Sequence, residues 1–274
     1  MIDAHQHFWN YDPVKDAWIT PEMGVLRRNF LPPDFKPVLD DFGIKGTVAV
    51  QADQSIEETF FLTDLAASCS FIKGVVGWVD LKAKNLESQL DQFAGIQVLK
   101  GFRHIIQAEP DFAFMLHKDF LKGAGLISGR GYTYDILIKP HQLDMAIRFS
   151  ESLPDARLVV DHLAKPPIAS GRWKEWAAGI EKFRQLDHVF CKVSGMVTEA
   201  DPENLHSENF RVYLDVITDV FGTGRMMYGS DWPVCLLATD YAGTLRIATD
   251  YFSSFTESER LSIFSGNAIR FYNL

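Results

Sequence analysis

Short apolar runs rich in β-branched residues recur along the chain and are typical of buried strands. Eight runs are predicted as strands, and they cover residues 1–8, 46–51, 75–81, 98–107, 132–138, 157–161, 189–193 and 226–229. Between them, apolar positions with a period near 3.6 predict helices, as over 57–69, 86–93, 141–153, 173–186 and 210–221. Strand and helix therefore alternate along the chain.

This alternation predicts an α/β protein built from βαβ units with right-handed crossovers. Eight units within 274 residues indicate a closed (β/α)8 TIM barrel, and the absence of a linker or low-complexity segment indicates a single domain over 1–274. The alternative, an open doubly wound sheet, would be favoured by a glycine-rich phosphate loop after the first strand. The sequence has no such loop.

Four of the segments that follow strands are long, namely 9–33, 108–123, 163–172 and 195–209. Loops of this length in a compact domain are usually functional. In a barrel they gather at the C-terminal face, where active sites of this fold lie. We therefore expect the functional site at that face.

Amino-acid composition and net charge indicate which kind of molecule the protein binds. Hydrophobic residues make up 47% of the chain, which is enough for a large core, and the formal net charge is −9. A negative charge without a cluster of Lys or Arg disfavours nucleic acid and anionic membranes, so we expect a small-molecule partner.

Three widely spaced cysteines, Cys69, Cys191 and Cys235, do not form the framework of a disulfide-rich secreted protein. The chain opens on a predicted strand rather than on a signal peptide, and no apolar stretch approaches the ~20 residues that span a bilayer. We expect a cytoplasmic protein, with homodimer formation left open.

Histidines, one arginine and one carboxylate stand at the ends of predicted strands. They are His5 and His7 in the first strand, Arg103 and His104 in the fourth, His162 after the sixth and Asp231 after the eighth. Alternation of side chains puts His5 and His7 on one face, roughly 6 to 7 Å apart. Groups of this kind at one rim of a barrel are suited to a metal site or to general acid and base catalysis.

Five segments together resemble the amidohydrolase superfamily, and more narrowly its branch of sugar lactonases of the L-fuconolactonase and L-rhamnonolactonase types. The segments read DAHQHFW at the start, GFRH in the fourth strand, DHLAKP after the sixth, CKVSG in the seventh and YGSDWPV in the eighth. The resemblance extends over effectively the whole chain. It implies a (β/α)8 barrel that hydrolyses a lactone in carbohydrate breakdown.

The resemblance also implies site positions at His5, His7, His162 and Asp231. The chain departs from the two-metal pattern of the superfamily, since the fifth strand, YTYDILI, has no histidine. Lys100 lies deeper in the fourth strand, and His141 lies beyond the fifth. We therefore expect one divalent ion such as zinc, with His5, His7 and Asp231 as ligands, or a metal-independent site.

Lactone opening needs a base for water, stabilisation of the carbonyl oxygen and a proton for the ring oxygen. We assign the base to Asp231, and expect stabilisation from a metal ion, from imidazoles including His162, or from Arg103 and Lys165. Neighbours on a strand face opposite ways, so only one of Arg103 and His104 points inward. His104 is the favoured contact to the substrate or oxyanion, with Arg103 at the rim or in a structural ion pair.

A polyhydroxylated substrate calls for hydrogen-bonding groups and flat apolar surface. Gln51 is a candidate for the former. Trp9 and Trp232 are candidates for the latter, together with Trp18, whereas Trp78 is expected in the core.

Two other readings remain open. A metal-dependent decarboxylase or an amide hydrolase would use the same barrel, because chemistry on this fold varies with its loops. A catalytically silent binding protein would also retain the barrel, but the presence of every candidate acid, base and ligand argues against it. The sequence does not distinguish between sugars or lactone ring sizes.

Overall fold

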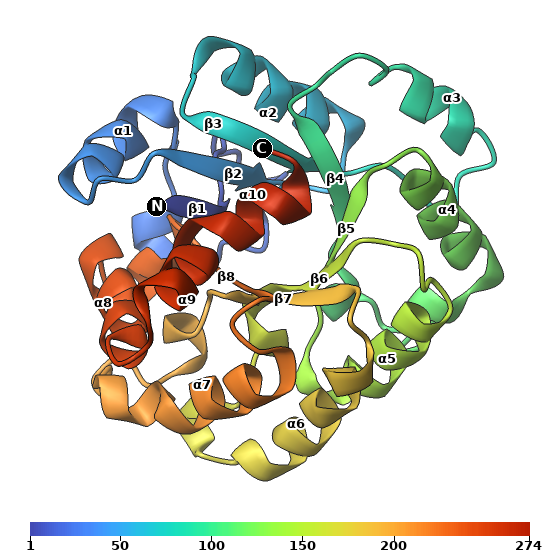
Figure 1. Cartoon of the computed structure of the whole chain (residues 1–274). Coiled ribbons are helices and arrows are strands. Elements are labelled where there is room, and N and C mark those ends of the chain that lie inside the picture. Colours follow the sequence, from blue (N-terminus) through green and yellow to red (C-terminus); the bar gives the residue numbers. More distant parts are fainter.

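The computed structural model describes residues 1–274, and its eight strands form one parallel sheet in the order β1 to β8 (Figure 1). The sheet closes where Gln6 of β1 pairs with Trp232 after β8, and the His7 amide donates to the Trp232 carbonyl at 2.7 Å. The strands are β1 Ile2–Gln6, β2 Gly46–Val50, β3 Ile72–Gly77, β4 Leu99–His104, β5 Thr133–Ile136, β6 Leu158–Val160, β7 Val189–Val193 and β8 Met226–Tyr228. The predicted (β/α)8 barrel is confirmed.

Helices surround the barrel in Figure 1. They are α1 Pro32–Asp41, α2 Ile56–Ser68, α3 Leu86–Asp91, α4 Lys118–Gly129, α5 Leu143–Glu151, α6 Trp173–Ile180, α7 Ser207–Phe221, α8 Tyr241–Phe252, α9 Glu257–Leu261 and α10 Asn267–Tyr272. None of them is long and apolar enough to cross a membrane.

The helices are held by apolar stripes that face the barrel. In α7, the buried side chains recur every three or four residues, as the helical period requires: Phe210, Tyr213, Leu214, Ile217, Val220 and Phe221. Burying a large apolar side chain contributes about 1.5–3 kcal/mol, so such a stripe fixes the helix on the sheet.

Two sequence predictions need correction. The sequence predicts the third strand over 75–81, whereas β3 runs from Ile72 to Gly77. The strand ends there because Trp78 turns towards α2, where its amide donates to Thr59 Oγ1. The segment 108–123 is not a continuous loop, because α4 begins at Lys118, where the apolar positions Phe120, Ala124 and Ile127 bury one face.

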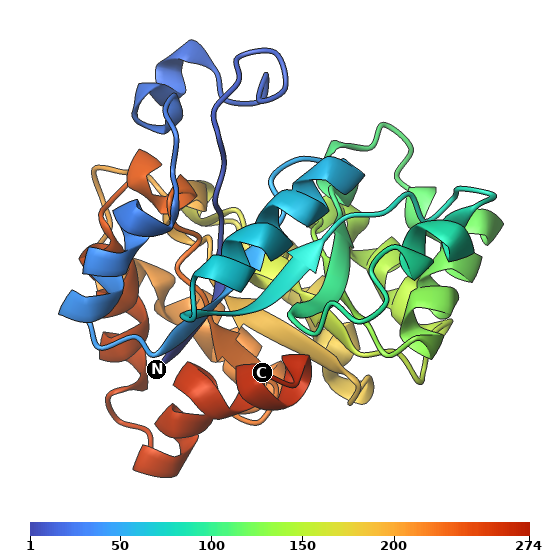
Figure 2. The same ribbon diagram turned by 90° about the horizontal axis from the view of Figure 1, so that it is seen from above.

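The interior of the barrel is apolar at its N-terminal end. Its side chains there come from five strands and from α10, which closes this end: Ile2, Ala4, Val48, Val50, Val76, Val159, Met227, Ala268, Phe271 and Tyr272. Figure 2 shows the segment between β1 and α1 projecting from the opposite end. The functional residues lie at that opposite, C-terminal end.

Candidate active site

Two histidines from the end of β1 meet at the centre of the barrel mouth. The pairing register of β1 shifts between Asp3 and Gln6, and the Nε2 atoms of His5 and His7 lie 3.2 Å apart. The Nδ1 atom of His7 lies 2.7 Å from the carbonyl oxygen of Val50. Because a carbonyl only accepts, Nδ1 of His7 carries a proton, and its Nε2 points towards the site.

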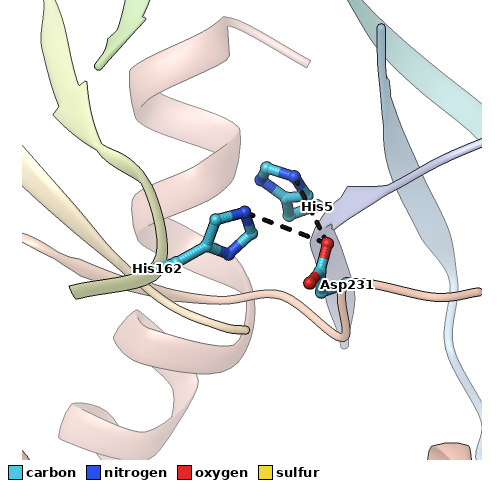
Figure 3. A group of neighbouring side chains, drawn as sticks. All are labelled: His5, His162 and Asp231. Atoms are coloured by element: carbon cyan, nitrogen blue, oxygen red, sulfur yellow. Dashed lines mark ion pairs between the residues drawn. The ribbon is translucent and has the colours of Figure 1, made fainter. Parts of the chain in front are cut away.

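Asp231 brings a carboxylate to these histidines. Its backbone is in the left-handed region, with φ +58°, and its amide donates to the His5 carbonyl at 2.8 Å. The Oδ1 atom lies 3.3 Å from His7 Nε2, 3.8 Å from His5 Nε2 and 3.9 Å from His162 Nε2. Figure 3 shows Asp231 facing the rings of His5 and His162.

A left-handed turn after β6 aims His162 at this carboxylate. The four residues from His162 to Lys165 all have φ between +52° and +56°, a conformation that costs a non-glycine residue about 1–2 kcal/mol. The turn is braced by the Trp176 indole, which donates to the Leu163 carbonyl at 2.8 Å. A Cβ on Gly195 would lie 2.4 Å from His162 Nδ1, so only glycine leaves room for the ring.

The cluster fits a divalent ion. Ligand atoms of His5, His162 and Asp231 all lie within 4.8 Å of one another, and His7 stands beside them. Two ligands of tetrahedral zinc, each at 2.0–2.1 Å, are about 3.3 Å apart, close to the separation of the His5 and His7 Nε2 atoms. The structure thus brings together all three predicted ligands and adds His162.

Below the cluster lies a buried layer of four charged side chains. Arg103 NH1 pairs with Asp161 Oδ2 at 3.0 Å, and Lys192 Nζ lies 3.1 Å from Asp161 Oδ1 and pairs with Asp135. Two cations and two carboxylates balance, as buried charges require. Lys192 Nζ also lies 3.1 Å from His5 Nδ1, so this layer supports the ring from below.

Burial and these charges set the protonation of the site. Burial lowers the pKa of His162 to about 4, and burial together with the Lys192 charge holds the pKa of His5 well below its ordinary value. Burial would raise the pKa of Asp231, but the neighbouring imidazoles of His162, His7 and His5 outweigh burial and lower that pKa. Near pH 7 the site therefore holds neutral His5 and His162 rings beside an ionised Asp231 carboxylate.

A cavity of about 450 Å³ opens onto the cluster, large enough for a sugar-sized ligand. At its inner end lie His7, Arg103, His162 and Asp231. Aliphatic side chains form another part of the wall, among them Ile105, Leu137, Val234 and Leu237. Trp18 and Met23, from the projecting segment before α1, also line the cavity.

The expectation that His104 points inward in place of Arg103 is wrong. Arg103 lines the cavity and forms the buried ion pair, whereas His104 faces the helices outside β4. There its ring stacks on Phe114 at 5.0 Å between centroids, and its Nε2 lies 2.7 Å from Glu109 Oε1. Because side chains alternate along β4, only one of these two neighbours can point inward, and it is Arg103.

The remaining predicted substrate contacts fall in different places. Lys165 lines the cavity, but Trp9 and Trp232 do not: both are almost fully buried, and Trp232 stacks on Phe35 at 4.3 Å. Gln51 is fully buried, and its side-chain oxygen accepts from Arg103. It therefore supports Arg103 from behind.

Sequence reasoning missed Asp135, Asp161, Lys192 and Glu199 as parts of the site. Lys192 had a visible signal, because a lysine within the apolar strand VFCKV has to be paired inside the barrel. The two-metal candidates Lys100 and His141 stay away from the cluster, as expected. Lys100 donates to the Asn273 carbonyl at the opposite end, and His141 packs on Phe112.

Comparison with known proteins assigns the chain to a family. A model of the amidohydrolase family matches residues 2–274. The chain belongs to the amidohydrolase family. Curated L-fucono-1,5-lactonases of Burkholderia multivorans and Burkholderia ambifaria are 38% and 34% identical to it, over all of this chain and 96% and 95% of their own lengths.

Solved structures give the same assignment. A crystal structure of an amidohydrolase from Burkholderia multivorans with bound zinc matches this amidohydrolase with a TM-score of 0.95 and 38% identity, covering 100% of this chain and 99% of the other. Among curated proteins, an L-rhamnono-gamma-lactonase of Scheffersomyces stipitis is 22% identical over 65% of this chain and 60% of its own length. The predicted family is confirmed, and the site contains a possible ligand set for one divalent ion, His5, His162 and Asp231.

Proposed function

We propose that this amidohydrolase hydrolyses the lactone of a sugar acid, such as an L-fucono-, L-rhamnono- or related aldonolactone. The observation that carries the proposal is the Asp231 carboxylate, which faces three imidazoles at the inner end of a cavity of about 450 Å³. Two curated relatives that match this chain over its full length, at 38% and 34% identity, are named as L-fucono-1,5-lactonases.

Asp231 acts as the general base. Water attacks the lactone carbonyl carbon while Asp231 Oδ1 accepts its proton, and the ionised state of the carboxylate near pH 7 leaves it ready to do so. The ester bond to the ring oxygen then breaks. The proton held by Asp231 passes to that oxygen, so the product is an open-chain hydroxy acid and the carboxylate is restored.

Arg103 and the imidazoles stabilise charge on the carbonyl oxygen. The Arg103 guanidinium reaches to 3.3 Å from His5 Nε2 and lines the cavity, so its positive charge lies beside the reacting group. His162, neutral near pH 7 and held by Ser194 Oγ at 2.9 Å, orients the water or the ring oxygen. Lys165 contacts the substrate farther out.

A divalent ion such as zinc, held by His5, His162 and Asp231 with His7 beside them, would polarise the carbonyl and lower the pKa of its water. The residues above orient the substrate and move the proton in either case. Hydrolysis measured with and without a chelator therefore shows whether the reaction needs the metal.

The partner is a small molecule, and we place the protein in the cytoplasm. Cys69, Cys191 and Cys235 are all free thiols, which suits a reducing compartment. A homodimer remains a prediction.

The test is hydrolysis of a panel of 1,4- and 1,5-sugar lactones, followed by proton release in weak buffer, before and after chelator treatment. We expect rapid turnover of at least one deoxy-sugar lactone. No turnover across the panel, even with added zinc, would favour the decarboxylase or amide hydrolase reading instead.

A further inference from the structure

Outside the catalytic cluster, two charged side chains line the cavity, Lys165 and Glu199. They come from different loops, the left-handed turn after β6 and a short turn after β7, and Lys165 Nζ lies 3.0 Å from Glu199 Oε1. About a fifth of the Lys165 side chain and a quarter of the Glu199 side chain remain exposed. The pair is thus accessible to a ligand in the cavity.

Most of the hydrogen-bonding capacity of this pair is unused within the protein. An ammonium group has three donors, and Lys165 uses one of them. Glu199 accepts only through Oε1, so its Oε2 has no protein partner. A donor and an acceptor of full charge therefore stand side by side with free positions.

The position of the pair is fixed relative to the catalytic residues. Lys165 ends the same left-handed turn that begins at His162, and its own φ is +52°. Strained backbone of this kind persists where the surrounding structure imposes it, and it concentrates at functional sites. The turn therefore places the His162 side chain beside Asp231 and the Lys165 side chain on the cavity wall.

We propose that the Lys165–Glu199 pair binds two neighbouring hydroxyl groups of the substrate and so selects lactones that carry a vicinal diol. Glu199 Oε2 accepts from one hydroxyl, and Lys165 Nζ donates to the next. Much of the remaining wall is aliphatic and offers no such bonds. This inference rests on the proposed lactonase function.

Among the other lining residues outside the cluster, the polar side chains are neutral and weaker candidates. The Thr198 hydroxyl already donates to the Gly195 carbonyl at 3.0 Å, and Gln107 is an uncharged amide. Hydrogen bonds to charged groups are roughly twice as strong as those between neutral groups. Discrimination by hydroxyl pattern is therefore assigned to the charged pair.

The experiment compares the best sugar lactone of the panel with analogues that each lack one ring hydroxyl. For wild type, we expect kcat/KM to fall about 10–100-fold when either of two neighbouring hydroxyls is removed, mainly through KM. In E199Q, kcat/KM for the parent lactone should fall by a similar factor. On the analogue that lacks the hydroxyl facing Glu199, kcat/KM of E199Q should be little lower than that of wild type, because the lost bond is the same one. K165M should behave likewise towards the adjacent position.

The control E208Q removes a carboxylate from an exposed ion pair with Arg211 and should keep the wild-type pattern. Thermal melting checks that each variant folds; if E199Q does not, K165M carries the same test. The diol site would be overturned if the effects of substitution and of hydroxyl removal on kcat/KM multiplied for every analogue. It would also be overturned if neither variant lost kcat/KM on the parent lactone. Failure of wild type on all sugar lactones would instead overturn the proposed function.

Discussion

Asp231 shows how one residue can hold a reactive charge inside a protein. Its left-handed backbone turns the carboxylate from β8 back over β1, and its amide bond to His5 locks it there. Three imidazole nitrogens lie within 3.9 Å of Oδ1. The group is buried yet ionised, which suits a base that must accept and return a proton in each turnover.

Asp231→Asn should abolish most lactone turnover without unfolding the protein. The amide has nearly the same shape but does not act as a base, so kcat should fall about 10²–10⁴-fold while the melting temperature stays close to that of wild type. The control is Asp240→Asn, which keeps the N-cap of α8 because asparagine caps as well as aspartate. Near-normal turnover in D231N would refute the assignment.

Gly195→Ala should impair both stability and activity. The substitution adds the cost of a non-glycine residue at φ +62° and drives a methyl group into the His162 ring. Gly171→Ala is a matched control, since it has φ +65° but an added Cβ meets nothing within 4 Å. Urea denaturation should show a loss of about 1–2 kcal/mol in G171A and more in G195A, and only G195A should lose turnover. Equal kcat in both variants would contradict this account.

At the scale of elements, α10 does more than close the barrel. Tyr272 reaches from this helix into the interior, where its hydroxyl lies 2.9 and 3.0 Å from the two carboxylate oxygens of Asp135 and donates its one hydrogen to that carboxylate. Asp135 in turn pairs with Lys192, which contacts His5. A helix at one end of the barrel is thereby connected to the cluster at the other end.

Tyr272→Phe should therefore destabilise the protein by about 1.5–3 kcal/mol, because a buried carboxylate loses its bonds to a hydroxyl. The urea midpoint at an unchanged m-value measures this loss. Tyr251→Phe removes a comparable bond to Asp215 at the surface and should cost less than about 1 kcal/mol. A smaller effect for Y272F than for Y251F would show that the interior layer tolerates an unpaired Asp135.

The sequence predicts elements better than side-chain directions. The alternation of strands and helices is sufficient to predict the barrel. The strand ends bring His5, His7, His162 and Asp231 to one rim together with Arg103 and His104, and the family resemblance selects the first four as site positions. Which of Arg103 and His104 points inward depends on the pairing register, which shifts between β3 and β4. The left-handed turn contains no glycine, so no local signal placed Lys165 beside Glu199.

At the scale of the whole molecule, a bound ion would link the site to global stability. Zinc that binds only the folded state at 100 times its Kd adds about 2.7 kcal/mol, or roughly 5–11 °C in melting temperature for a chain of this size. We expect this shift in wild type and in His117→Asn, which changes an exposed histidine, but a smaller one in D231N. Equal shifts in all three proteins would place zinc elsewhere.

The closing contact between Gln6 and Trp232 also has a consequence for synthesis of the chain. The histidines of β1 are synthesised early and Asp231 is synthesised late. At about 5–20 residues per second, Asp231 follows His7 by roughly 10 to 45 s. During that interval the ribosome carries a partly made barrel with an open edge and an incomplete cluster. Activity therefore reports that synthesis has passed β8 and that the barrel has closed, and any fragment that stops before β8 should be inert.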